Sequence, residues 1–239
     1  MLRAELLKIR SLPTPRNTTL IVLATILIAS VVVLIVSPEQ GNDAYFRVPE
    51  AASNITVTIG AMVLGAWMIG LEFASKTIRL VATVQPNRLR FVFTKLVAAK
   101  LLLIAFAVLC LSFAFAAAAL LSSIGSTTFD GGQVFKQMLG TLVIALLWGI
   151  FAFGLTLLLR SYTGGIVGTL VLALGLDPIL QIIPSVGKYS FGSASESISN
   201  WISGDPTSLG IWIALLASLA WVLAINALGC LRFVARDLK

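Results

Sequence analysis

The chain has 239 residues, of which 58% are hydrophobic and only 11% are charged, and its mean hydropathy is +1.00. Soluble domains carry roughly 25% charged residues, so the composition predicts an all-α integral membrane protein with one membrane domain, residues 1–239. The absence of histidine excludes histidine-based catalysis. The two cysteines lie in separate apolar runs, which argues against a disulfide framework or a zinc site.

Residues 1–16 predict a short amphipathic helix at the membrane surface, because apolar residues recur on one face and the cations lie largely on the other. Pro13 and Pro15 end this pattern. Six apolar segments then follow, each long enough to cross a membrane as a helix. They cover residues 18–36, 51–71, 97–122, 137–159, 164–183 and 207–231, with a polar loop expected at 185–206.

The distribution of cations predicts the orientation of these six spans. An even number of spans puts both termini on one side of the membrane. That side, with the turns at residues 72–100 and at Arg160, holds 14 of the 17 Lys and Arg residues. Only Arg47, Lys136 and Lys188 fall on the other side. The positive-inside rule therefore predicts cytoplasmic termini, and the net charge of +7 requires no nucleic acid as a partner.

Residues 72–96 are the one long basic, amphipathic stretch outside the termini. A first helical pattern runs from Thr77 to Val84 and must end before Pro86. A second begins at Asn87, with an apolar face that leaves Arg88 and Lys95 facing elsewhere. The pattern predicts a cytoplasmic helix that contacts a partner. The alternative is that these cations only hold the loop in the cytoplasm.

The chain carries little that would support catalysis. It has no GxxxxGK[ST] phosphate-binding loop, and intramembrane proteases of the Ser–His or HExxH type need histidine. A lipid-synthesising transferase would need several acids near the cytoplasmic face to bind magnesium, whereas Asp177 is the one acid inside an expected span. We therefore expect no catalytic residue, no metal and no cofactor in this chain.

Asp177 is the residue whose position most needs an explanation, because a carboxylate within a span costs free energy unless it faces a cavity or a partner. Pro178 follows it, so a helix break there would let Asp177 cap the next segment. A contact with a transported substrate is the second interpretation. Trp67 and Trp148 also fall inside spans, where they line the translocation path or, more simply, pack in the core.

The segment from Glu72 to Lys95 resembles the cytoplasmic signature of type-2 ABC exporter permeases. In that family a Glu near the end of the second helix is followed by Gly-Thr-(Leu/Ile)-Arg, by Pro-x-Arg, and by a Lys that opens the third helix. Here Lys76 replaces the usual Gly. The basic N-terminal helix, the six spans and Asp177-Pro178 also match that layout. The matching signature residues are Glu72, Thr77, Ile78, Arg79, Pro86, Arg88 and Lys95.

The resemblance implies a non-catalytic subunit of a bacterial plasma membrane exporter. It would pair with a second permease subunit, identical or paralogous, and with ABC ATPase subunits that hold the ATP and Mg²⁺. The residues expected at the ATPase contact are Glu72, Thr77, Ile78, Arg79, Val81, Ala82, Pro86 and Arg88.

The small number of charges inside the spans favours an amphipathic substrate, whether a peptide, a drug or a lipid. The alternative function is an ATP-independent secondary transporter or a small immunity-type membrane protein. A lipid-modifying enzyme is the remote third possibility.

Overall fold

The computed structural model describes residues 2–36, 44–75, 77, 88–124 and 130–235, and its regular elements in these ranges are all helices. In chain order they are α1 (Leu2–Ser11), α2 (Pro13–Val36), α3 (Ala44–Ala74), α5 (Arg88–Ile124), α6 (Gly131–Leu159), α7 (Tyr162–Val171), the π-helix η1 (Leu172–Leu176), α8 (Asp177–Gln181), α9 (Pro184–Gly187), α10 (Phe191–Ser203) and α11 (Ile211–Ala235).

Six of the helical segments in these ranges are long and apolar enough to cross a membrane. They confirm the number of spans expected from the sequence, although several begin earlier than predicted. The third span is part of a helix that starts at Arg88 rather than at residue 97. The fourth starts at Gly131 rather than at 137, because the Asp130 side chain caps it by accepting from the N–H groups of Gly132 and Gln133.

The fifth span is continuous where a break was expected at Asp177-Pro178. The π-helix η1 lies directly before this pair, and the Asp177 N–H donates to the carbonyl of Leu172. Pro178 has no N–H, so the α-helical ladder loses a hydrogen bond at this point in any case. A wider π turn accommodates that loss, and the chain continues as α8.

The expected polar loop at residues 185–206 is the largest error of the sequence analysis. Most of it forms α10, whose N-cap is Ser190 and which ends at Gly204, a residue with φ of +84°. Phe191, Ala194 and Ile198 are buried on one face of α10, at the spacing of an amphipathic helix. The many serines of this segment favoured a loop in the sequence analysis. In the structure the hydroxyls of Ser195 and Ser197 donate to carbonyls of the same helix, so these serines are compatible with a helix.

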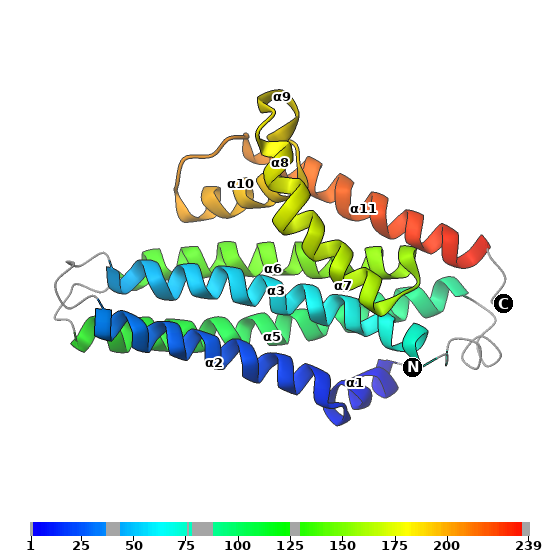
Figure 1. Cartoon of the computed structure of the whole chain (residues 1–239), viewed down its shortest axis with the longest axis horizontal. Coiled ribbons are helices and arrows are strands. Elements are labelled where there is room, and N and C mark those ends of the chain that lie inside the picture. The colour runs from blue at the N-terminus through cyan, green and yellow to red at the C-terminus, as the bar shows by residue number, and fades with distance from the viewer. Residues whose placement is uncertain (1, 37–43, 76, 78–87, 125–129, 236–239) are drawn as a thin grey trace.

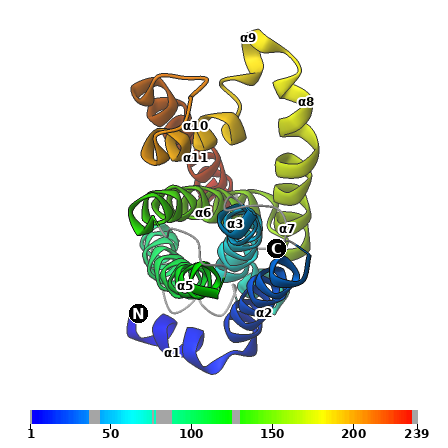
Figure 2. The ribbon, with the colours of Figure 1, turned by 90° about the vertical axis from the view of Figure 1, so that its left-hand side faces the viewer.

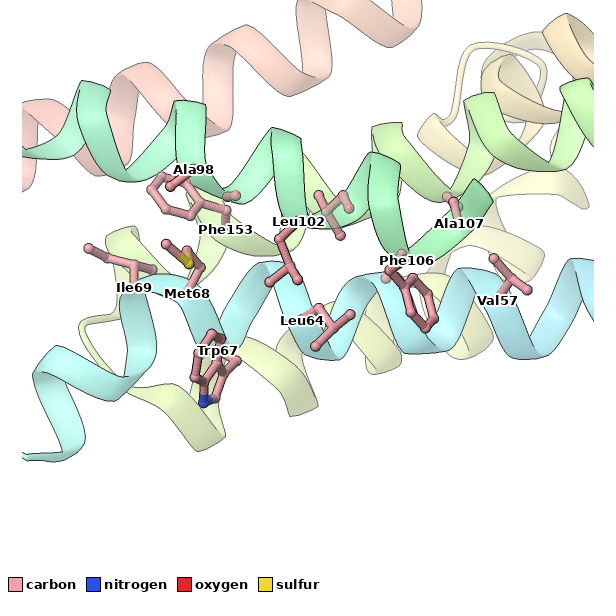
Figure 3. Packing of buried hydrophobic residues seen from close by; sticks show 14 of the residues in the cluster. Val57, Leu64, Trp67, Met68, Ile69, Ala98, Leu102, Phe106, Ala107 and Phe153 are labelled. Carbon is pink, nitrogen blue, oxygen red and sulfur yellow. The ribbon is translucent and has the colours of Figure 1, made fainter. Parts of the chain in front are cut away.

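The helices α2, α3, α5 and α6 lie side by side as a long bundle, and α10 and α11 cover α6 on its other side (Figures 1 and 2). The core lies between α3, α5 and α6. It contains Leu64, Leu102, Phe106 and Phe153, all buried (Figure 3). Backbones of α3 and α6 touch at Gly65, where an added Cβ would lie 1.9 Å from the Gly149 carbonyl oxygen. Small residues at such crossings let helices approach closely inside a membrane.

One end of the bundle gathers the beginnings and ends of several helices. There, α1 lies against the start of α5, at the end of the bundle where α3 and α11 also end (Figure 1). Arg88 donates to the carbonyls of Phe233 and Val234, and Arg160 donates to that of Arg232. Cations at a helix C-terminus satisfy carbonyls that have no partner within the helix. The two arginines therefore fix the end of α11 to this side of the bundle.

Candidate functional site

A buried ion pair between Glu72 and Lys95 is the centre of the candidate site. Glu72 lies in the last turn of α3, and Lys95 lies two turns into α5. The Lys95 Nζ is 2.9 Å from Glu72 Oε1, and the two side chains are only 2% and 3% exposed. Nζ also donates to the Met68 carbonyl at 3.4 Å. The pair joins the two helices that flank residues 76–87.

Helix α1 completes this pair and makes it a cluster of four charges. Glu5 Oε2 accepts from Lys95 Nζ at 2.9 Å, and Lys8 Nζ donates to Glu72 Oε1. Lys95 thus uses its three N–H donors on Glu5, Glu72 and the Met68 carbonyl. Two acids and two lysines balance in charge, which is the condition under which charges persist out of water.

The cluster corrects two expectations about side-chain direction. Lys95 was expected to face away from the apolar side of its helix, yet it is among the most buried side chains. It can be buried because its Nζ donates to the carboxylates of Glu5 and Glu72. The cations of α1 were expected largely on the face opposite its apolar residues, yet Lys8 turns inward to Glu72. The inward side of α1 carries Glu5 and Lys8 together with Ile9, which packs on the core.

The cluster extends directly to the predicted coupling residues. The Thr77 hydroxyl donates to Glu72 Oε2 and also lies 2.8 Å from the Ser75 hydroxyl. Glu72, Thr77 and Arg88 therefore all lie at this end of the bundle, although Arg88 contacts α11 and not the cluster. The remaining predicted coupling residues lie outside the described residues: Ile78, Arg79, Val81, Ala82 and Pro86.

A second feature is a pocket of about 280 Å³ on the opposite half of the bundle, between α3, α6, α8 and α10. Asp177 lines it and is 8% exposed. Its Oδ1 accepts from the Gly192 N–H at 2.9 Å, in the first turn of α10, and its Oδ2 accepts from Gln181 Nε2 at 2.8 Å. The sequence predicted that Asp177 caps the segment directly after Pro178, but α8 has no side-chain cap, and Asp177 instead accepts from an N–H in the first turn of α10, 15 residues further on.

The pocket brings together two of the three residues expected on a translocation path. Trp148 lines it together with Asp177, and its ring centroid lies 4.6 Å from that of Phe191 in α10. Trp67 does not reach the pocket. It is 3% exposed and belongs to the main hydrophobic core, on the side of α3 that faces away from α5 (Figure 3), which agrees with the packing interpretation.

Several polar residues of these two features were missed by sequence reasoning, and Glu5, Thr58 and Glu196 are three of them. Glu5 joins the charge cluster, whereas Thr58 and Glu196 line the pocket. An acid on the inward side of a basic helix was a signal for Glu5, since it lies one turn before Lys8. No sequence pattern marks Thr58 as special, because a hydroxyl in a span usually bonds to its own helix.

Comparison with models of known protein families and with curated proteins gave no match. The fold itself defines the class: within the described ranges, the chain is an all-helical protein with the six long apolar helices of a multi-pass membrane protein. The two features lie at different depths of that bundle, a charge cluster at one end and a polar pocket in the other half.

Proposed function

We propose that this chain is the transmembrane permease subunit of an ATP-binding-cassette exporter in a bacterial plasma membrane. It moves an amphipathic substrate outward by alternating access, driven by separate ATPase subunits. In this proposal both termini and residues 72–96 are cytoplasmic, the chain itself holds neither ATP nor Mg²⁺, and a second permease subunit completes the pathway.

The observation that carries the proposal is the ion pair between Glu72 and Lys95. These are the outermost charged residues of the signature segment, and they meet in a nearly dry environment. A helix between them that contacts an ATPase would pull on both α3 and α5 at once. Because α3 also packs along α6, such a displacement would reach the centre of the bundle.

The N-terminal helix gives this arrangement a fixed point at the membrane surface. Glu5 and Lys8 of α1 hold Lys95 and Glu72 respectively, so the two ends of the coupling segment are tied to one external helix. Buried ion pairs contribute little net stability compared with apolar packing of the same volume. Their value here is geometric, because they specify which residues of α1, α3 and α5 face one another.

Purification of the affinity-tagged chain from its native membranes tests the proposal, because an ABC ATPase should accompany it. We expect the two proteins to co-purify in detergent and the complex to hydrolyse ATP. The chain purified alone should hydrolyse none, because it has no phosphate-binding loop. Hydrolysis by the isolated chain that survives removal of contaminants would contradict the proposal. Substrate movement by the chain in liposomes without any ATPase would instead favour an ATP-independent transporter.

A further inference from the structure

The pocket lined by Asp177 is built from polar groups placed at membrane depth. Along α3, Thr58 lies about 21 Å from Glu72 at ~1.5 Å per residue, within a hydrocarbon layer of ~30 Å. If the charge cluster marks the cytoplasmic side, the pocket lies in the outer half of the membrane. Asp177 and Glu196, on α8 and α10, both line it.

Neither acid forms an ion pair within the described part of the chain. Asp177 receives one hydrogen bond on each oxygen, from Gly192 and Gln181, both uncharged donors. A carboxylate has about four lone-pair sites, so acceptor capacity remains on both oxygens. Carboxylates at membrane depth ordinarily have a cationic partner or face a path for one.

Thr58 provides an independent sign that the pocket takes a ligand. It is 9% exposed, it lines the pocket, and its Oγ1 has no hydrogen-bond partner. Several other buried hydroxyls bond to a carbonyl one turn back, as Thr156 does to Ala152 and Thr169 does to Gly165, whereas Ser218 of α11 also has no partner. A buried hydroxyl without a partner destabilises the fold, and Thr58 differs from Ser218 in lining the pocket, where a donor from outside could satisfy it.

We propose that this pocket binds a primary ammonium group carried on an apolar chain. An ammonium has three donors, and Asp177, Glu196 and Thr58 carry acceptor groups into the lining of one pocket from three different helices. Trp148 presents an aromatic ring, which attracts cations further. Met62 and Leu174 offer an apolar lining for the attached chain. The pocket thereby specifies the charge of the exporter's amphipathic substrate, and this inference rests on the proposed function.

The size and composition of the pocket exclude two other occupants. A volume of about 280 Å³ holds one head group with the start of its chain, and a whole folded peptide is too large. Calcium and magnesium need six or more oxygen ligands in defined geometry. Within the described residues no group of three acids, cysteines or histidines is arranged to hold a metal ion.

Photolabelling of the full-length chain in phosphatidylcholine nanodiscs tests the inference. The probes are dodecylammonium with a diazirine in its chain and the matching dodecanol, with labelled peptides mapped by mass spectrometry. We expect the ammonium probe to label pocket peptides of α3, α6, α8 and α10 about tenfold more than the alcohol does. Equal labelling by the two probes would overturn the inference.

Three variants separate binding from folding. Asp177→Asn keeps an acceptor for the Gly192 N–H but removes the charge, and we expect labelling by the ammonium probe to fall about tenfold. Glu196→Gln, on an exposed position that tolerates change, should lower it about threefold. Asp205→Asn is the matched control, because Asp205 is an exposed acid outside the pocket. Parental labelling in folded Asp177→Asn and Glu196→Gln would overturn the inference.

Thr58→Val gives the sharpest result, because its two expected effects have opposite signs. The valine removes a buried oxygen that has no partner, so the ligand-free protein should melt at a higher temperature. The same change removes an acceptor for the ammonium and should lower labelling several-fold. Thr156→Val, where the hydroxyl is satisfied, should not raise the melting temperature. Parental labelling in Thr58→Val would remove this residue from the site and contradict the three-acceptor geometry.

Competition identifies the source of the ammonium group. An excess of a single-chain aminolipid and an excess of a lysine-bearing amphipathic peptide are each tested against the labelled probe. The competitor that reduces labelling identifies the source of the ammonium group. If neither competitor reduces labelling, the inference is overturned. Labelling requires neither ATP nor an ATPase, so its failure is distinct from a failure of co-purification, which bears on the proposed function alone.

Discussion

Lys95 and Glu72 meet at 2.9 Å in the interior of the bundle, although the chain leaves α3 and returns as α5 between them. Each lies on a different helix, and each also holds a residue of α1. The segment between them is therefore anchored at both ends to the same small cluster. Changes in this cluster separate its contribution to stability from its contribution to coupling.

Lys95→Met should destabilise the protein by about 3–5 kcal/mol, because it leaves the two acids Glu5 and Glu72 with Lys8 as the one cation remaining in the cluster. The double variant Glu72→Leu with Lys95→Met should recover most of that loss, since apolar residues of similar volume replace the pair. Reversible unfolding in mixed micelles measures both values. Lys100→Met, on the exposed side of the same helix, is the control and should be nearly neutral.

Coupling should not recover in the double variant. We expect the protein with Glu72→Leu and Lys95→Met to reach parental stability and still lose ATP-driven transport, because the geometric tie between α1, α3 and α5 is gone. Transport by the ATPase complex in proteoliposomes measures this. Full transport at restored stability would show that the cluster is structural only.

The proposed orientation, with both termini in the cytoplasm, predicts the accessibility of introduced cysteines. In a background without Cys110 and Cys230, a cysteine at Ser11 or Asn87 should be shielded from an impermeant thiol reagent in intact cells. A cysteine at Thr207, exposed in the segment before α11, should react. The reason is the excess of cations on the side of the termini. Reaction at Asn87 from outside would reverse the topology and contradict an ATPase contact there.

Arg79 lies in the predicted coupling segment, where the sequence places Ile78 and Val81 toward an apolar cleft and Arg79 at its rim. Arg79→Glu adds repulsion to the loss of a pair, so it should weaken ATPase binding more than Arg79→Ala does. Co-purification and transport at matched expression measure the effect. Arg47→Glu, which the proposed topology puts on the opposite side of the membrane, should change neither. If Arg79→Glu binds the ATPase and transports like the parent, Arg79 does not take part in the contact.

The sequence was sufficient for the six spans, because hydropathy is a local property that marks a helix in a membrane. The contact of Asp177 with α10 was not predicted, because it joins residues 15 positions apart and the local cap expected after Pro178 does not form. The charge cluster was not predictable in the same way. Lys95 lies inward because it pairs there with acids of α1 and α3. The local pattern of α5 cannot predict this, because Glu5 lies 90 positions earlier in the chain. The amphipathic pattern of α10 was present in the sequence but obscured by its serines.

Gly192 is the position where the pocket and the fold depend on the absence of a side chain. Its N–H donates to Asp177 Oδ1 at 2.9 Å, and a Cβ added there would lie 1.9 Å from Asp177 Oδ2. Gly192→Ala must therefore displace the carboxylate, and with it the cap on α10. We expect a loss of about 1–3 kcal/mol from overpacking and from the weakened cap.

The same substitution should move the carboxylate away from the pocket, so labelling by the ammonium probe should fall together with stability. Gly210→Ala is the matched control, because nothing lies within 4 Å of a Cβ added there. Thermal unfolding and photolabelling of both variants measure the effect. If Gly192→Ala has the melting temperature and the photolabelling of the parent, then Asp177 neither caps α10 tightly nor binds the ammonium. Loss of stability with intact labelling would keep the cap and reject Asp177 as the ligand group.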